Sequence, residues 1–235
     1  MRDFDDAVVV VTGASSGLGR AIAQEVARRG AKAVAINFLG PLEEGEQTAT
    51  VVRDSGAEPI LVPGDVANDA DCRRVAASVS RFGRIDALFN NAGTTKFAVD
   101  HSQLDAVSGE DFARIYAVNV IGPYQMIRAA RSLLEAGSHA GAVVNTASLA
   151  GIIGVGSSVP YAASKGALIT MTLSLARALA PKIRVNAICP GFIDTPWFKM
   201  PAGDVEKLRQ SVIATVPLHL ASKPEDIALP AVFLA

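Results

Sequence analysis

Cysteine is scarce in this sequence of 235 residues: Cys72 and Cys189 lie far apart and form no CxxC pair. The sequence therefore predicts no disulfide framework and no metal site, and it favours a reducing, cytoplasmic location. The start, MRDFDDAVVVV, carries acidic residues where a signal peptide needs basic ones. No stretch approaches the ~20 apolar residues of a transmembrane helix, so we expect no signal peptide and no contact with a membrane.

An excess of charge is missing as well, since 22 Lys and Arg stand against 23 Asp and Glu. Neither nucleic acid nor an anionic membrane surface is an expected partner of such a chain. Half of the residues are hydrophobic and 19% are charged, which is typical of a globular protein. The sequence contains no linker, repeat or low-complexity segment, so residues 1–235 are predicted to form a single domain.

Short β-branched runs alternate with longer helical stretches along the chain. Continuous apolar strands belong in a parallel sheet covered by helices on both faces, so we predict a doubly wound α/β fold. The expected strands are 7–12, 33–38, 59–63, 86–90, 141–147 and 183–188, and the expected helices lie near 17–30, 42–56, 68–82, 108–135 and 161–180. Residues 191–220 are predicted to be an irregular aromatic segment, including Met200 and Pro201, that builds the substrate pocket or a lid.

A glycine-rich turn, TGASSGLG (12–19), follows the first strand and opens the first helix. Its glycines, Gly13, Gly17 and Gly19, permit a tight turn, and the helix N-terminus offers free N–H groups to a phosphate. A plain strand-to-helix turn would contain the same glycines. The position on the first strand of a βαβ series favours a dinucleotide site.

The second strand closes with Asn37, where a dinucleotide site usually has an acidic residue for the ribose diol. Asn37 can bond a hydroxyl group but carries no charge. Neither its neighbours nor the turn residues Ala14, Ser15 and Ser16 supply a basic side chain for a 2′-phosphate. An unpaired phosphate would lose charge-assisted hydrogen bonds, so the sequence favours NAD over NADP.

The third and fourth strands also close with polar residues. Asp65 and Val66 follow the third strand, where Asp65 could cap a helix that starts near Asn68 or accept a bond from an adenine amino group. FNNAG (89–93) closes the fourth strand. Its two side-chain amides either face the ligand crevice at the carboxyl ends of the strands, or the segment is only a turn.

YAASK (161–165) places a phenol and an amine four residues apart. A helix that starts near Pro160 would hold Tyr161 and Lys165 on one face, although an isolated pair of this kind is common in amphipathic helices. Gly166 costs about 1 kcal/mol relative to alanine inside a helix. Gly166 and the small residues around it predict that another helix or a cofactor packs closely against this segment.

Six motifs stand in one order: TGASSGLG, NNAG, Asn119 in YAVNVIGPY, Ser148 in NTASLAG, YAASK and PGFIDT (190–195). This order closely resembles the short-chain dehydrogenase/reductase family, and within it the 3-oxoacyl-carrier-protein reductases, from the first strand to about residue 235. The resemblance implies a Rossmann fold with strand order 3-2-1-4-5-6. Family members normally continue to a seventh strand, which is absent from this sequence: either the sequence given, which stops at Ala235, is truncated, or the last strand is missing.

The resemblance implies a catalytic tetrad of Asn119, Ser148, Tyr161 and Lys165. Tyr161 would exchange a proton with the substrate oxygen, and Ser148 would hydrogen-bond the same oxygen. Lys165 would lower the pKa of the phenol and hold the nicotinamide ribose. Asn119 would hold a water that links Lys165 to solvent.

The same resemblance implies the residues that would contact the cofactor, from its adenosine end to its nicotinamide end. Besides Tyr161 and Lys165, they are Gly13, Ser15, Ser16, Gly17, Leu18, Gly19, Asn37, Asp65, Val66, Asn91, Ala92, Gly93, Pro190, Gly191, Ile193 and Thr195.

The implied function is hydride transfer between NAD or NADP and a small carbonyl compound or secondary alcohol. A ketoreductase and a dehydrogenase of sugars both remain open. The alternative is a dinucleotide-binding sensor or scaffold without turnover, which the presence of Ser148, Tyr161 and Lys165 disfavours. The family is usually dimeric or tetrameric, so we expect a homodimer or homotetramer in which the helices near 108–135 and 161–180 pack between subunits.

Overall fold

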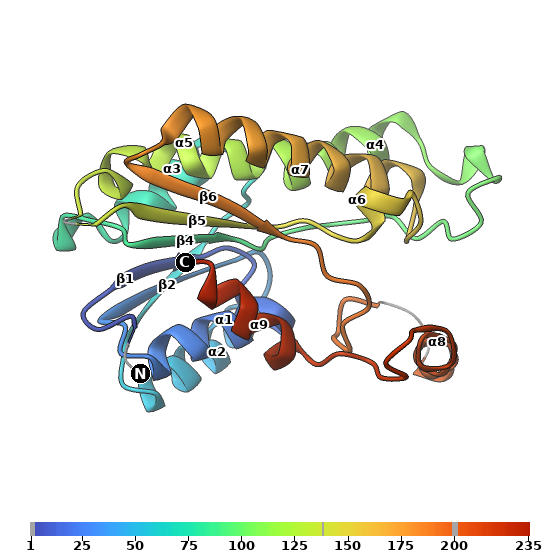
Figure 1. Cartoon of the computed structure of the whole chain (residues 1–235), viewed down its shortest axis with the longest axis horizontal. Helices are drawn as coiled ribbons and strands as arrows, with labels where there is room; N and C mark the ends of the chain where they lie inside the picture. The colour runs from blue at the N-terminus through green and yellow to red at the C-terminus, as the bar shows by residue number, and fades with distance from the viewer. Residues whose placement is uncertain (1–2, 138, 199–201) are drawn as a thin grey trace.

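A computed structural model describes residues 3–137, 139–198 and 202–235 (Figure 1). Six parallel strands form one sheet in the predicted order, and the described residues contain no seventh strand. The doubly wound α/β prediction is therefore confirmed. The strands are β1 (Val8–Val11), β2 (Ala33–Phe38), β3 (Glu58–Pro63), β4 (Ala87–Asn90), β5 (Gly141–Thr146) and β6 (Ile183–Ile188).

Helices cover both faces of the sheet (Figure 1). The four consecutive valines of β1 are all fully buried because alternate side chains enter two separate cores. One core lies under α1, α2 and α9, and the other under α3, α5 and α7. The helices are α1 (Gly17–Arg28), α2 (Leu42–Asp54), α3 (Asp69–Ala77), α4 (Gly109–Tyr116), α5 (Gly122–Leu134), α6 (Ala150–Ile153), α7 (Val159–Leu179), α8 (Ala202–Thr215) and α9 (Pro224–Phe233), with 3₁₀ turns η1 (Ser80–Phe82) and η2 (Leu104–Ala106).

The helix predicted near 108–135 is present, but it is not α-helical throughout. A π-helical turn, η3 (Ala117–Ile121), separates α4 from α5. Pro123 follows this turn, and proline disrupts the preceding helical hydrogen bonds because it lacks an N–H group and crowds the turn before it. Gly122 packs tightly here, since a Cβ at this position would lie 2.9 Å from Cγ2 of Val66.

Three further predictions of the local structure need correction. The helix expected over 68–82 ends at Ala77, and η1 follows it. The segment 191–220 is not irregular throughout, because α8 occupies Ala202–Thr215, where Lys207 and Arg209 pair with acidic residues one turn earlier. Helices α6 and α9 were not predicted at all. Met200 and Pro201 lie outside the described residues.

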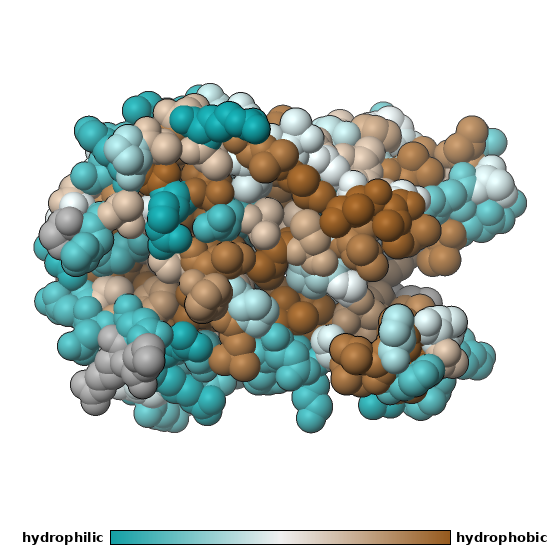
Figure 2. All heavy atoms as spheres, in the orientation of Figure 1, coloured by the Kyte–Doolittle hydropathy of each residue, from teal (hydrophilic) through white to brown (hydrophobic). Residues whose placement is uncertain are grey.

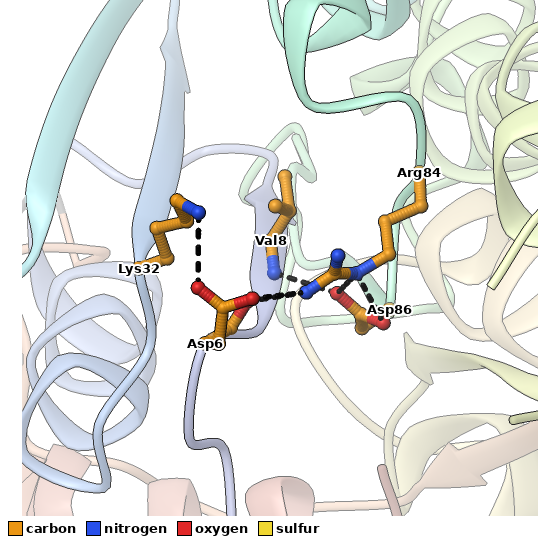
Figure 3. Close-up of polar contacts among 5 residues, drawn as sticks. All are labelled: Asp6, Val8, Lys32, Arg84 and Asp86. Atoms are coloured by element: carbon orange, nitrogen blue, oxygen red, sulfur yellow. Dashed lines mark hydrogen bonds and ion pairs between the residues drawn. The ribbon is translucent and has the colours of Figure 1, made fainter. Parts of the chain in front are cut away.

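A cluster of charged side chains lies at the amino ends of strands β1, β2 and β4 (Figure 3). Asp86 accepts a 2.7 Å hydrogen bond from the backbone N–H of Val8, which joins the loop before β4 to β1. Arg84 bridges the carboxylates of Asp86 and Asp6, and Lys32 pairs with Asp6 at 3.0 Å. These contacts lie at the amino ends of the strands, opposite the edge where polar motifs were predicted. The cluster therefore stabilises the fold and leaves the carboxyl edge for a ligand.

In the described part of the chain, none of the helices combines the length and apolar composition needed to span a membrane. The same residues contain no group of three or more His, Cys, Asp or Glu side chains placed to hold a metal ion.

Candidate active site

The glycine-rich turn joins the end of β1 to α1. Gly13 and Gly17 have φ values of +61° and +51°, a region that favours glycine. A Cβ on Gly19 would lie 2.2 Å from the Gly13 carbonyl oxygen, so no larger residue fits there. Ser16 precedes α1 without capping it through its side chain, which leaves the first N–H groups of the helix to an anion. The turn therefore fits a pyrophosphate.

Thr12 fixes this turn to the end of β4. Its Oγ1 accepts 3.0 Å hydrogen bonds from the backbone N–H groups of Asn91 and Ala92. The side-chain amide of Asn91 in turn donates to the Gly13 carbonyl at 3.0 Å. Thr12 was not among the predicted site residues, although its place between a buried strand and the first glycine indicates that it lies at the turn. The cofactor contacts predicted for Asn91, Ala92 and Gly93 stay predictions.

Asn37 lies at the carboxyl end of β2, as expected for a residue near the adenosine. Its side chain is buried, and its amide donates to the carbonyls of Val62 and Gly64 at 3.1 and 3.0 Å. A ribose hydroxyl can therefore reach only its oxygen. Glu44, which was not among the predicted site residues, also lies near this end of the site: its carboxylate accepts a 3.2 Å hydrogen bond from the Ser15 hydroxyl at the glycine-rich turn.

Asp65 does not cap α3. Asn68 does so instead, accepting a 2.9 Å hydrogen bond from the N–H of Ala70. One oxygen of Asp65 accepts from the Ala67 N–H at 3.0 Å, and the other pairs with Arg114 on α4 at 2.8 Å. The helix-cap interpretation is therefore wrong, and the predicted adenine contact remains open. No sequence signal pointed to Arg114, because α4 is distant along the chain.

Tyr161 and Lys165 lie one turn apart on α7, as predicted. The helix begins at Val159 because Ser158 caps it, accepting a 3.4 Å hydrogen bond from the N–H of Tyr161, and Pro160 lies in the first turn. The Lys165 ammonium lies 5.7 Å from the centre of the Tyr161 ring. The two functional groups therefore share one face of the helix.

Lys165 is a buried cation, with 3% of its surface exposed. Its Nζ donates a 2.7 Å hydrogen bond to the carbonyl of Thr146 at the end of β5. Burial disfavours the charged form and lowers the pKa of this ammonium to about 8. Lys165 is therefore still largely protonated at neutral pH, at a cost in folding stability.

Because burying this charge destabilises the fold, we expect Lys165→Met to raise the Tm at pH 7. The rise should be about 2–4 °C for each kcal/mol gained in the free energy of unfolding. The unfolded chain should titrate near the ordinary value of 10.5, whereas the folded chain titrates near 8. Because the folded protein loses its proton first, its stability rises with pH between these values, and the advantage of the variant shrinks there.

Thermal unfolding at pH 7 and pH 10 tests this prediction, with the exposed Lys207→Met as the control, for which no such pH-dependent gain is expected. A variant that is less stable than wild type by the same amount at both pH values would contradict it.

Burial raises the pKa of the Tyr161 phenol above its ordinary value, and a hydrogen bond with Ser148 partly offsets the rise. The Lys165 ammonium donates to the Thr146 carbonyl and lies over the Tyr161 ring, and its predicted lowering of the phenol pKa stays a prediction. Ser148 itself follows β5, where its hydroxyl accepts a 3.1 Å hydrogen bond from the N–H of Ala150.

Asn119 occupies the π-helical turn η3 and is fully buried. Its amide donates to the carbonyl of Thr94 and to the hydroxyl of Ser164, both at 3.0 Å, and its oxygen accepts from the Thr94 N–H at 2.8 Å. Asn119 thus joins the loop after β4 to α7, the helix that carries Tyr161. Its predicted role in holding a water stays a prediction.

The segment after β6 closes the site. Ile193 forms an isolated bridge with Ser222, and Thr195 approaches the glycine-rich turn, with Cγ2 3.3 Å from where a Cβ on Gly17 would lie. A Cβ on Gly93 would lie 3.7 Å from both the Trp197 ring and the Lys165 ammonium. The stretch from Pro190 to Trp197 therefore lies near Ser148, the glycine-rich turn and Tyr161, and its predicted contacts with the nicotinamide stay predictions.

Comparison with known proteins agrees with this arrangement. A family model described as enoyl-(acyl carrier protein) reductase matches residues 13–235. A protein named as ketoacyl reductase 2 of the granaticin polyketide synthase of Streptomyces violaceoruber is 42% identical over 94% of this chain and 86% of its own length. L-Rhamnose 1-dehydrogenase (NAD(P)(+)) of Azotobacter vinelandii is 37% identical over 98% of this chain and 90% of its own length.

Solved structures give the same result. A short-chain dehydrogenase/reductase from Burkholderia xenovorans superimposes with a TM-score of 0.89 and 42% identity, over 97% of this chain and 90% of the other. Levodione reductase superimposes with a TM-score of 0.88 and 31% identity, over 98% and 91% of the two chains. The fold and the site define a dinucleotide-binding oxidoreductase. The chain belongs to the short-chain dehydrogenase/reductase family.

Proposed function

We propose that this protein is an NAD(P)(H)-dependent enzyme that transfers hydride between the nicotinamide and a carbonyl carbon or secondary alcohol. One observation carries the proposal: Ser148, Tyr161 and Lys165 meet at the sheet edge that also holds the glycine-rich turn. The names of the relatives, among them a ketoacyl reductase, levodione reductase and a rhamnose dehydrogenase, support the same class of reaction. The alternative of a sensor without turnover leaves this arrangement unexplained.

In the proposed reaction, the phenol of Tyr161 donates a proton to the carbonyl oxygen as the alcohol forms, and takes it back in the reverse direction. The Ser148 hydroxyl donates a hydrogen bond to the same oxygen, where negative charge develops. The ammonium of Lys165 offsets the charge on the resulting phenolate. The nicotinamide, when bound, supplies or accepts the hydride.

The cofactor would be held along the carboxyl edge of the sheet. The N–H groups that begin α1, with Gly13, Ser15, Ser16, Gly17, Leu18 and Gly19 around them, would hold the pyrophosphate. Asp65 and Val66 would meet the adenine. Pro190, Gly191, Ile193 and Thr195 would bracket the nicotinamide, and Asn119 would hold the water near Lys165. The segment 191–220 would form the substrate side of the site.

We further propose NAD as the preferred cofactor, because the Glu44 carboxylate lies beside Ser15 and would repel a 2′-phosphate, while the nearby Arg20 guanidinium already donates to Ser15, Thr48 and Gln47. The dissociation constant of NADH is expected to be at least about fivefold lower than that of NADPH. Glu44→Gln is expected to remove most of this difference. Titrating the protein with NADH and with NADPH measures the two dissociation constants. Trp197, the one tryptophan of the chain, lies at the site, so its fluorescence should report binding of either cofactor.

Glu43→Gln is the matched control, since it removes the same charge from the neighbouring position on α2. It is expected to leave the ratio of the two dissociation constants within about twofold, because adjacent positions of a helix point about 100° apart and it is Glu44 that contacts Ser15. Tighter binding of NADPH by the wild type would overturn the NAD preference. Failure to bind either cofactor would overturn the proposed function.

The proposed assembly is a homodimer or homotetramer in which α4, α5 and α7 pack between subunits. The exposed apolar side chains Phe112, Ile121, Tyr124 and Leu173 on and between these helices support it. Figure 2 shows hydrophobic surface on the part of the molecule that α6 and α7 occupy in Figure 1. The substrate is expected to be a small molecule, and the cytoplasmic location stays a prediction.

A further inference from the structure

Four aromatic side chains gather beside Tyr161, and together they are called the aromatic box: Phe97, Phe192, Trp197 and Phe198. The Phe192 and Phe198 rings stack with centroids 5.0 Å apart, and Phe97 lies 6.1 Å from Phe198. The Trp197 ring lies 6.0 Å from that of Tyr161. Aromatic residues make up 6% of the chain, so this concentration at one place calls for an explanation.

The aromatic box is built from separate segments of the chain. Phe97 belongs to the loop after β4, and the other three members belong to the segment after β6. The Ala98 N–H donates a 2.7 Å hydrogen bond to the carbonyl of Ser157, which ties the first loop to the residues just before α7. All four side chains are only half-buried, so their rings keep accessible area. Figure 2 shows a notch in the molecular surface between α8 and the body above it.

Two charged side chains close to the aromatic box in sequence are engaged in ion pairs, while Lys199, which follows Phe198, lies outside the described residues. Lys96, which precedes Phe97, pairs with Asp111 at 3.5 Å. Asp194 pairs with Arg209 on α8 at 3.3 Å. The described side chains that gather beside Tyr161 on this side are therefore mainly aromatic. A polyhydroxylated substrate would lose hydrogen bonds with water here without replacement, whereas a ring system would pack face to face or edge to face.

We propose that the substrate carries its carbonyl group on an aromatic or alicyclic ring system that packs against the aromatic box. This inference rests on the proposed function. In the reductive direction, the reduced nicotinamide gives hydride to the carbonyl carbon and becomes oxidised. Tyr161 gives its proton to the carbonyl oxygen, and the ring ketone becomes a ring alcohol. A proton from solvent then restores the Tyr161 phenol, so each turnover consumes one reduced nicotinamide and one proton.

The first test compares kcat/KM for the reduction of 2-tetralone, cyclohexanone and 2-butanone, and for the oxidation of L-rhamnose. We expect kcat/KM for 2-tetralone to exceed that for 2-butanone on the order of 100-fold, because the fused rings can pack against the aromatic box. Preferred turnover of L-rhamnose or 2-butanone that Tyr161→Phe abolishes would overturn the substrate class and leave the proposed function intact. No turnover of any of these compounds would overturn both.

The second test uses Phe198→Ala, which is expected to raise the KM for 2-tetralone about tenfold or more while kcat/KM for 2-butanone changes less than about threefold. Phe198→Trp, which keeps an aromatic ring, should restore most of the affinity for 2-tetralone. Phe233→Ala is the matched control, since this exposed ring lies at the end of α9, outside the aromatic box. Equal losses for both ketones in Phe198→Ala would show a merely structural role and overturn the inference.

Discussion

Tyr161→Phe is expected to lower kcat for ketone reduction about a thousandfold while the dissociation constant of the cofactor changes less than about threefold. The substitution removes one hydroxyl group, which is the proton donor in the proposed reaction, and keeps the ring. Packing around the ring should survive, because its contacts with Trp197 and with the Lys165 ammonium involve the ring face. The loss should therefore appear in kcat, as expected for an interaction made only in the transition state.

Steady-state kinetics with 2-tetralone, or with a ketone that has a higher kcat/KM, measure kcat. A cofactor titration followed by Trp197 fluorescence measures the dissociation constant. Tyr124→Phe is the matched control, since this exposed tyrosine on α5 lies away from the site and its hydroxyl has no role in the proposal. Its kcat should stay within about twofold of wild type. Tyr161→Phe with more than a tenth of wild-type kcat would refute the role of the phenol as proton donor.

Gly151→Ala is expected to lower both the Tm and kcat, although residue 151 carries no functional group. A Cβ at this position would lie 2.5 Å from the backbone of Lys165 and of Gly166, distances that real side chains do not reach. Helix α6 or α7 would have to shift, at a cost of about 1–3 kcal/mol, which corresponds to about 3–10 °C in Tm. Because α7 carries Tyr161 and Lys165, and α6 follows Ser148, the shift should also misalign the catalytic groups.

Thermal unfolding and kcat at saturating substrate provide the two measurements. Gly109→Ala is the matched control: it adds the same methyl group at the start of α4, where no atom lies within 4 Å, and should leave both quantities nearly unchanged. Wild-type stability and activity in Gly151→Ala would show that α6 and α7 tolerate a wider separation than the structure gives.

The sequence alone was sufficient to predict the sheet and the residue types of the candidate site. All six strands were placed within one or two residues, because a run such as the four valines of β1 is compatible only with burial on both faces. The spacing of Tyr161 and Lys165 predicted their shared face, since a helix repeats every 3.6 residues. Gly166 predicted a closely packed partner, and α6 confirms it, with Gly151 against Gly166.

Other features depended on contacts between residues that are distant in sequence. Periodicity shows which face of an element is buried, but not which side chain from another element meets it there. Only the tertiary structure therefore placed Arg114 beside Asp65 and introduced the π-helical turn η3 where Gly122 packs against Val66. It also placed the Lys165 ammonium within hydrogen-bond distance of the Thr146 carbonyl.

The aromatic box is the clearest case of this kind. Phe97 and Phe198 are a hundred residues apart in the chain, and no local pattern relates them. They meet because the loops after β4 and β6 leave the same edge of the sheet and converge on α7. The sequence thus determined that the motifs of this family occur in their usual order. The tertiary structure decided which side chains surround Tyr161, because that depends on how the sheet brings separate loops together.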